Sequence, residues 1–127
     1  MITRNTQSST ISHRHRHSAA NRDSAPFDVV VESDGTGSLV FVEGELDLAT
    51  APALRDIVGA LVDSCSHIIV DFAELRFIDS SGLSALVALH SQSTAAGVRF
   101  ALRNPPPMVR RVLALTGIDH LIPTEGP

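Results

Sequence analysis

Four consecutive residues, Asp79-Ser80-Ser81-Gly82, bring a carboxylate and two hydroxyls together between an apolar segment and a predicted helix. At the start of a helix, the carboxylate or a hydroxyl can accept hydrogen bonds from the free backbone amides of the first turn. A serine at the same place can also accept a phosphate, because exposed amides and the helix dipole favour an anion there. The residues alone predict a helix cap or a phosphoacceptor, and their spacing does not choose between Ser80 and Ser81.

Patterns that are typical of enzymes are absent from the chain. No pair of histidines encloses the glutamate of a zinc-binding helix, and neither a Walker loop nor a G-x-G-x-x-G follows a strand. Ser81-Gly82 lacks the flanking glycine of a nucleophile elbow. The single cysteine, Cys65, excludes an internal disulfide and a cysteine metal cluster. We therefore expect no enzyme activity, no metal and no cofactor.

The charge of the chain is unevenly distributed. Residues 1–25 carry four Arg and one Asp, a net charge of +3, whereas residues 26–127 carry six Arg and thirteen acidic residues, a net charge of −7. An acidic body argues against nucleic acid as the main partner, since phosphate contacts need a basic surface. No apolar stretch approaches a membrane span or the core of a signal peptide, so we expect no membrane association and a cytoplasmic location.

Residues 1–25 are rich in Ser, Thr, Arg and His, and we expect them to form a disordered polar tail. Within them, His13, His15 and His17 alternate with arginines. Such a run could bind a divalent metal weakly, but a solvated tail is the expectation. Residues 26–127 are predicted to form one domain.

The domain is predicted to be α/β, with a mixed sheet of four to five strands against which helices pack. Two strands joined by a glycine-rich turn come first, and helices then alternate with strands in the order β-β-α-β-α-β-α-β. The predicted strands are 27–33, 38–44, 67–72, 98–103 and, at an edge, 118–123; the predicted helices are 50–65, 80–96 and 105–116.

The helix that follows Asp79 has an unusual composition, because residues 80–98 contain no Asp, Glu, Lys or Arg. Leu83, Leu86 and Val87 are predicted to face the core. The opposite face carries Ser84 and other small or uncharged residues, which suits either a docking surface or packing inside the domain. Its first turn lies at the carboxyl end of a predicted parallel strand, where α/β folds place their sites.

Three segments together resemble a known family: "VEGELDLATAP", "HIIVDFAELRFIDSSGLSAL" and "RNPPPMVRRVLALTGIDHLI". They are similar to a STAS domain and, more narrowly, to bacterial anti-sigma factor antagonists. The resemblance covers about residues 27–123 and leaves residues 1–25 outside. It rests on G-E-L-D, a strand ending in V-D-F, the D-S-S-G helix start and T-G-I, all in the same order as in the family.

The resemblance implies a protein-binding switch. The unmodified antagonist would bind an anti-sigma factor, a Ser/Thr kinase of the histidine-kinase-like ATPase fold, and so free the sigma factor. The kinase would phosphorylate Ser80 and end the complex, and a PP2C-type phosphatase would restore the active form. Asp47 would lie near this site, with Asp79 and Ser81 flanking the acceptor and Gly82 leaving room for the partner's backbone.

Two other binding modules share this domain. One is a STAS subunit that docks on the ATPase of a lipid-transporting ABC system, which is the alternative to the sigma switch. The other is a stressosome-type scaffold, whose N-terminal sensor domain would not fit in 25 residues. The complete D-S-S-G favours the switch, and the expected oligomeric state is a monomer.

Overall fold

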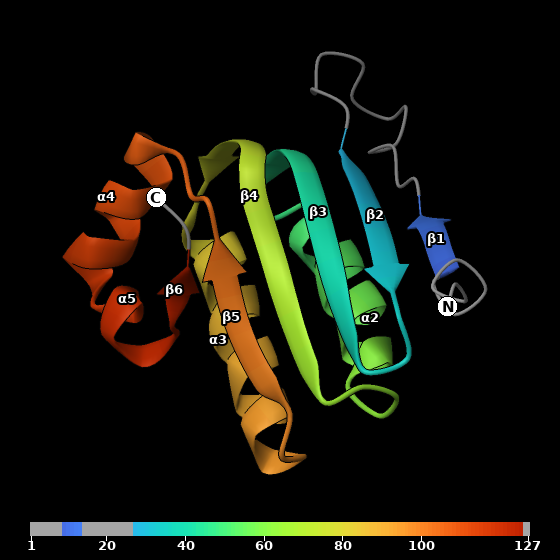
Figure 1. Cartoon of the computed structure of the whole chain (residues 1–127). Helices are drawn as coiled ribbons and strands as arrows, with labels where there is room; N and C mark the ends of the chain where they lie inside the picture. Colours follow the sequence, from blue (N-terminus) through green and yellow to red (C-terminus); the bar gives the residue numbers. More distant parts are fainter. Residues whose placement is uncertain (1–8, 14–26, 126–127) are drawn as a thin grey trace.

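The computed structural model describes residues 9–13 and 27–125, which form one six-stranded sheet and four helices (Figure 1). The strands lie side by side in chain order from β1 to β6. The elements are β1 (Ser9–His13), β2 (Asp28–Ser33), β3 (Gly37–Leu46), α2 (Ala51–Leu61), β4 (His67–Ile78), α3 (Ser80–Ala95), β5 (Arg99–Arg103), α4 (Pro107–Thr116), α5 (Ile118–Leu121) and β6 (Thr124–Glu125).

The sheet is mixed, as the sequence predicts. β1, β2 and β3 pair antiparallel, whereas β3, β4, β5 and β6 pair parallel. The parallel pairs β3–β4 and β4–β5 are joined through α2 and α3, which lie behind the sheet in Figure 1. The predicted α/β architecture is therefore confirmed, and the carboxyl ends of β3, β4 and β5 meet at one edge, at the top of the figure.

One hydrophobic core fills the space between the sheet and the helices. In β2 and β3 every second residue points into it, so Val29, Val31, Val40 and Val42 are almost fully buried. This period of two is what a sheet with one covered face requires. The helices contribute Leu54, Val58, Leu86, Leu89, Val109 and Leu113 to the same cluster.

The prediction for the N-terminal tail is wrong at Ser9–His13. These residues form β1, which pairs antiparallel with β2, with Ile11 opposite Val31. Their polar composition gives no apolar alternation, and the pairing uses the backbone groups that the edge of β2 would otherwise leave without partners. Residues 1–8 and 14–26, which include His15 and His17, lie outside the described residues, as does the side chain of His13.

The predicted last strand, 118–123, is also wrong. Ile118–Leu121 is a short helix, and the strand that follows is only Thr124–Glu125. Gly117 ends α4 with φ 79°, and α5 starts there. Ile118 and Ile122 lie one helical turn apart, with a 2.8 Å hydrogen bond from Ile122 N to Ile118 O, and both are buried in the core. This helical spacing favours the turn over a strand.

The turn between β2 and β3 contains the one carboxyl group with a strongly shifted pKa in the described part of the chain. Asp34 Oδ1 accepts hydrogen bonds from Thr36 N at 3.0 Å, Gly37 N at 3.1 Å and Thr36 Oγ1 at 2.9 Å. Because these bonds favour the ionised form, they lower the pKa of Asp34 from its ordinary value of 3.8 to about 2.

Because of Asp34, part of the free energy of unfolding is therefore expected to be lost at acid pH. A carboxyl group with a lowered pKa in the folded state contributes stability above pH 3.8, and this contribution disappears as the pH falls toward 2. Carboxyl-detected NMR should give an Asp34 titration midpoint near 2, and Asp34→Asn should remove this share of the acid dependence. A midpoint near 3.8 in the folded protein would contradict the expectation.

Candidate functional site

Asp79 caps helix α3. It follows the last residue of β4, and its extended backbone (φ −117°, ψ −171°) turns the chain into the helix. Asp79 Oδ1 accepts hydrogen bonds from Ser81 N at 2.8 Å and Gly82 N at 3.2 Å. The prediction that Asp79 caps the helix is confirmed. The cap uses the backbone of Ser81 and leaves the hydroxyls of Ser80 and Ser81 outside it.

The two serine side chains differ in accessibility. Ser80, the first helical residue, is exposed, whereas Ser81 is half-buried. No hydrogen bond within residues 27–125 involves the Ser80 hydroxyl. An enzyme that transfers a phosphoryl group must reach the acceptor oxygen and align it for attack, so the geometry favours Ser80 over Ser81.

Ser80 borders an apolar groove of about 440 Å³ between α3 and the junction of α4 with α5. The exposed Ser84 lies one helical turn further along α3 and also lines this groove. The remaining lining residues are Leu83, Val87, Ala88, Thr116 and Ile118. We call this surface the α3–α4 groove. It can take up an apolar side chain of a partner next to the Ser80 hydroxyl.

The sequence predicts the core-facing side of α3 only in part. Leu86 is buried in the core, and Leu83 and Val87 pack against it but are only half-buried and also line the α3–α4 groove. The fully buried positions are instead Gly82, Ala85, Leu86, Leu89 and Ser93. Small residues on both sides of the helix weaken the periodic signal, so the pattern locates the buried stripe only in part.

Gly82 has a role inside the domain. It is buried, and a Cβ atom added there would lie 2.7 Å from Leu46 O and 2.8 Å from Ile78 Cγ1. The expected role of Gly82, leaving room for a partner's backbone, does not fit this position. Glycine here lets the start of α3 pack directly against the end of β3, where Asp79 N also donates to Leu46 O at 3.2 Å.

Comparison with known proteins agrees with the fold. The model of the STAS domain family matches residues 29–126. The chain belongs to the STAS domain family. It is 33% identical over 99 residues to the anti-sigma-F factor antagonist RsfB of Mycobacterium tuberculosis, a match that covers 76% of this chain and 80% of RsfB.

Two solved structures of antagonists are also similar to this STAS domain. An anti-sigma factor antagonist from Mycobacterium paratuberculosis has a TM-score of 0.73 and 34% identity, covering 82% of this chain and 91% of the other. The antagonist SpoIIAA in its unphosphorylated form has a TM-score of 0.67 and 25% identity, covering 77% and 88%. The resemblance inferred from the sequence is thus confirmed at the level of the family.

Asp47 shapes the loop between β3 and α2 of this STAS domain. Its Oδ1 accepts hydrogen bonds from Ala49 N at 3.0 Å and Thr50 N at 3.1 Å, so the carboxylate holds the turn before α2. Asp47 directly follows Leu46, which contacts the start of α3. Leu48, at the tip of the loop, has 77% of its surface exposed. The loop therefore adds an apolar side chain to this end of the molecule.

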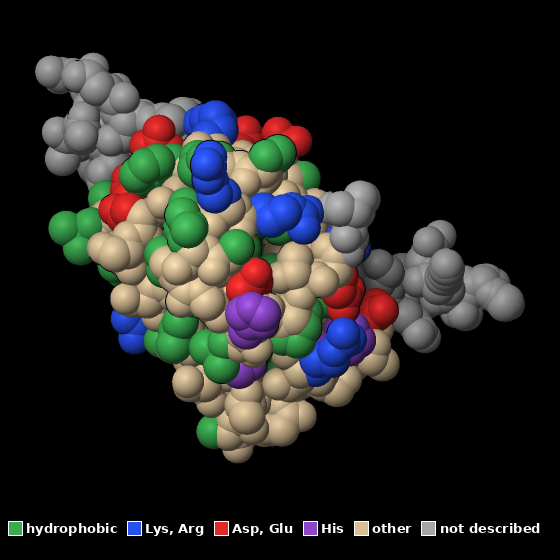
Figure 2. All heavy atoms as spheres, turned by 90° about the vertical axis from the view of Figure 1, so that its left-hand side faces the viewer, with side chains coloured by type: hydrophobic (Ala, Val, Ile, Leu, Met, Phe, Trp, Pro, Cys, Tyr) green, Lys and Arg blue, Asp and Glu red, His purple; other side chains and the backbone are tan. Residues whose placement is uncertain are grey.

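The surface around the groove carries exposed apolar side chains. Leu115 of α4, next to Thr116 in the groove, is 79% exposed. Figure 2 shows this side of the molecule, with hydrophobic side chains spread between uncharged ones, several basic side chains near its upper edge, and acidic and histidine side chains near its centre. Single exposed leucines are common on protein surfaces, but a groove with apolar neighbours indicates an interaction site.

Sequence reasoning missed the wall of the groove that lies outside α3. Thr116 and Ile118 come from the junction of α4 and α5, 36 and 38 positions after Ser80. The only sequence feature that marks these two residues is the T-G-I segment. It is one of the motifs that the chain shares with the family, but the sequence analysis assigns it no function. Further along α3, Gln92 Nε2 donates to Gly59 O of α2 at 3.4 Å, so that part of the small-residue face packs within the domain.

None of the described helices is long and apolar enough to cross a membrane. Within residues 9–13 and 27–125, no group of three or more His, Cys, Asp or Glu side chains is arranged to hold a metal ion.

Proposed function

We propose that this STAS domain is an anti-sigma factor antagonist controlled by phosphorylation of Ser80. In the unphosphorylated state it binds an anti-sigma factor kinase of the histidine-kinase-like ATPase fold, and the sigma factor is released. The observation that carries the proposal is the exposed Ser80 hydroxyl at the rim of the apolar α3–α4 groove. Two similar proteins support the proposal, because RsfB and the Mycobacterium paratuberculosis protein are both anti-sigma factor antagonists by name.

The position of Ser80 makes a phosphate compatible with the fold. A phosphoserine carries about −1.5 to −2 charges at pH 7. At the first helical position it meets the positive end of the α3 dipole, where an anion gains roughly 0.3–1 kcal/mol. Because Ser80 is exposed and its hydroxyl has no partner within the described residues, adding the phosphate removes no internal contact.

The same phosphate would oppose docking at the groove. A partner that covers the α3–α4 groove must strip water from Ser80 and from the nearby Asp79 carboxylate. A phosphate there is a second anion that loses its water when the partner binds. An unpaired charge buried at an interface costs about 2–5 kcal/mol of binding free energy. Phosphorylation is thus expected to change binding much more than folding. SpoIIAA, a similar antagonist, is described in its unphosphorylated form, which supports a switch of this kind.

The protein acts in this proposal as substrate and ligand, without catalysing a reaction. The kinase transfers the γ-phosphoryl group of ATP to Ser80 Oγ, which loses its proton, and ADP leaves. A PP2C-type phosphatase hydrolyses the phosphoserine and returns the domain to its binding state. Asp47, Asp79, Ser81 and Ser84 belong to the proposed contact region, and Gly82 supports that region from within the core.

Phosphosite mapping tests the proposed acceptor. The protein is purified from its native bacterium and digested, and the peptide that spans residues 77–99 is fragmented by mass spectrometry. We expect one phosphate on Ser80, with none after Ser80→Ala and an unchanged phosphate after Ser81→Ala. If the phosphate persists in Ser80→Ala and disappears in Ser81→Ala, the acceptor is Ser81 and the proposal for Ser80 is wrong.

A further inference from the structure

The face of the sheet opposite the helices, which we call the open face, has an apolar centre. It faces the viewer in Figure 1, and no described helix packs on it. Its central positions hold Val30, Leu39, Phe41 and Ile69, all half-buried. Val30 lies beside Phe41 in the register of β2 and β3, and Leu39 lies beside Ile69 in that of β3 and β4. A sheet face in water normally alternates to polar residues at such positions, so this centre suits a covered surface.

The two arginines of β5 on the open face are engaged by carboxylates of the same face. Arg103 Nε donates to Asp71 Oδ2 at 2.8 Å, and Arg99 Nη2 donates to Glu125 Oε2 at 2.7 Å. Asp71 is only 4% exposed. A partner that covers the face therefore does not leave this carboxylate buried without a cation, which is the costly outcome for a charge.

The remaining charges of the open face are mainly negative. A row of carboxyl residues crosses the sheet beyond the apolar centre. Asp28 lies beside Glu43 in the register of β2 and β3, and Glu43 lies beside Glu74 in that of β3 and β4. Glu32 and Asp34 add two more carboxylates on β2 and its turn. Like charges on neighbouring strands repel each other, so the row favours a cation beside it.

Other basic residues near the face do not cancel this charge. His67 begins β4, at the end of the strand away from the row. Arg76 and Glu45 lie beyond the row, on β4 and β3, and contribute one charge of each sign. Within residues 9–13 and 27–125, the carboxylates of Glu43 and Glu74 take part in no ion pair, and both residues are exposed.

A hollow of about 250 Å³ joins the apolar centre to the row of carboxylates. Val30, Phe41 and Ala73 give it apolar lining, and Glu43 and Glu74 give it negative charge. Such a hollow matches an arginine side chain, whose apolar stem packs on apolar surface and whose planar guanidinium stacks on aromatic rings. Neighbouring strands are about 4.8 Å apart, and a guanidinium has five N–H donors, so it can bind both glutamates at once.

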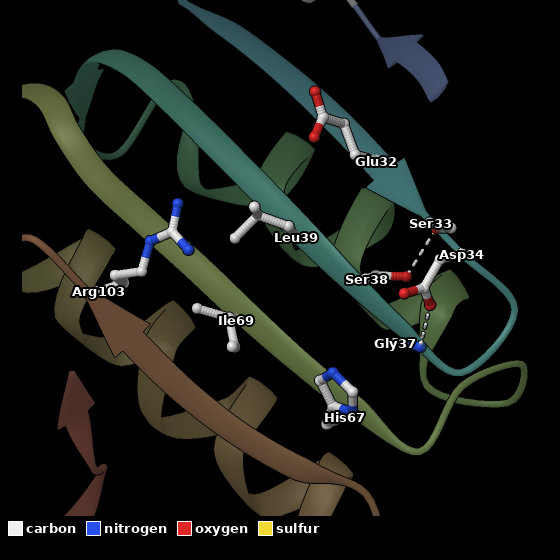
Figure 3. A pocket seen from close by; sticks show the side chains of 9 residues that line it. All are labelled: Glu32, Ser33, Asp34, Gly37, Ser38, Leu39, His67, Ile69 and Arg103. Atoms are coloured by element: carbon white, nitrogen blue, oxygen red, sulfur yellow. Dashed lines mark hydrogen bonds between the residues drawn. The ribbon is translucent and has the colours of Figure 1, made fainter. Parts of the chain in front are cut away.

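A second hollow, of about 340 Å³, continues the surface along β3. Figure 3 shows Glu32 and Arg103 on opposite sides of it, with Leu39 and Ile69 between them. Leu39 lies two residues before Phe41, a separation of about 7 Å along a strand. Residues i and i+2 of an extended peptide are separated by the same distance. An arginine in the first hollow therefore places an apolar residue of the same peptide over the second.

We propose that the open face binds an extended segment of a partner protein in which an arginine lies two positions from an apolar residue. The arginine occupies the hollow beside Phe41, with its guanidinium between Glu43 and Glu74, and the apolar residue covers Leu39 and Ile69. Charge complementarity selects this occupant, because the arginines of β5 are already paired and the excess charge of the face is negative. Arginine is also among the residues that contribute most to binding at protein interfaces.

This binding surface is separate from the α3–α4 groove. The groove lies on the helical side of the sheet, whereas the open face lies on the other side. The partner on the open face therefore depends neither on the kinase nor on phosphorylation of Ser80, and Ser80→Glu should bind it as wild type does. Failure of this proposal would leave the proposed switch intact, and the reverse also holds.

NMR titration with a synthetic peptide tests the proposal. The probe is acetyl-Leu-Thr-Arg-Thr-Leu-amide, added to the ¹⁵N-labelled full chain at up to millimolar concentration. We expect the largest shifts at the amides of Phe41, Glu43 and Glu74, with smaller ones at Leu39 and Ile69. Shifts confined to the helical side would overturn the proposal. So would their absence, which would leave the face to a second copy or to another part of the chain.

The same peptide with citrulline in place of arginine separates charge from shape. Citrulline keeps the length and planarity of the side chain and removes its positive charge. Because charge-assisted hydrogen bonds are about twice as strong as neutral ones, the dissociation constant should rise about fivefold or more. Equal binding of both peptides would overturn the role of the carboxylates, and equal shifts with Ca²⁺ alone would show a site for any cation rather than for a peptide.

The double variant Glu43→Gln/Glu74→Gln tests the two carboxylates. It should bind the arginine peptide no better than the citrulline peptide, and its melting temperature should be equal to or above that of wild type, because repulsion along the row is relieved. Asp56→Asn/Asp63→Asn is the matched control, since it removes the same charge from exposed residues at α2 and should bind as wild type does. Equal losses in both double variants would reduce the effect to net charge and overturn the site.

Discussion

Ser80→Glu is expected to weaken binding to the anti-sigma factor kinase about thirty-fold or more while changing the melting temperature by only a few degrees. The new carboxylate lies at the rim of the apolar α3–α4 groove, next to the Asp79 carboxylate that caps α3. A docked partner would have to desolvate both anions. In the free protein the same charge is exposed and lies at the positive end of the helix dipole, so folding is barely affected.

Calorimetric titration of the purified kinase measures this effect. Ser80→Gln separates charge from size, because it adds a side chain of similar volume without the negative charge and should retain more affinity than Ser80→Glu. Ser91→Glu is the matched control for charge, since Ser91 is an exposed serine on the same helix, outside the groove. Equal losses for Ser80→Glu and Ser91→Glu would contradict a site at the start of α3.

Gly82→Ala is expected to lower the free energy of unfolding by about 1–3 kcal/mol, the usual cost of overpacking a core. The added methyl group would lie 2.7 Å from Leu46 O, a backbone atom that cannot turn aside as a flexible side chain can. Relief of the clash must move the start of α3 away from β3, which would strain the Asp79 N–Leu46 O hydrogen bond. The displacement also shifts Ser80, so kinase binding should fall with stability.

Gly59→Ala provides the matched control in urea denaturation. Gly59 lies inside α2, and a Cβ atom there would meet only the end of the Gln92 side chain, at 3.4 Å. Alanine is favoured over glycine within a helix by up to about 1 kcal/mol, so this variant should be neutral or more stable. If Gly82→Ala proved as stable as Gly59→Ala, the close packing of α3 on β3 could not be the reason for glycine at this position.

The sequence predicts those features of the fold that depend on local patterns. The alternation of Val29 and Val31, the apolar run that begins β4 and the acid before α3 each have a direct physical meaning, and the structure confirms them. The order of strands and helices then determines which elements lie side by side. The position of Ser80 at the carboxyl edge of the sheet follows from that order.

Features that depend on contacts between residues far apart in the chain could not be predicted from local sequence patterns. β1 pairs through its backbone, and its polar residues carry no strand pattern. The wall formed by Thr116 and Ile118 reaches α3 only after the chain has crossed β5 and α4. The contact that makes Gly82 necessary involves the backbone of Leu46, and a sequence gives no sign of which carbonyl will approach a glycine.

An affinity capture from lysate of the native host tests the central claim most directly, with wild type and Ser80→Glu as parallel baits and mass spectrometry of the eluates. The proposed switch predicts a small histidine-kinase-like ATPase that binds wild type and is lost with Ser80→Glu. Recovery of an ABC ATPase and its membrane subunit by both baits equally would contradict the switch. Ser80 would then be no more than the first residue of α3, and the protein would be a subunit of a transporter.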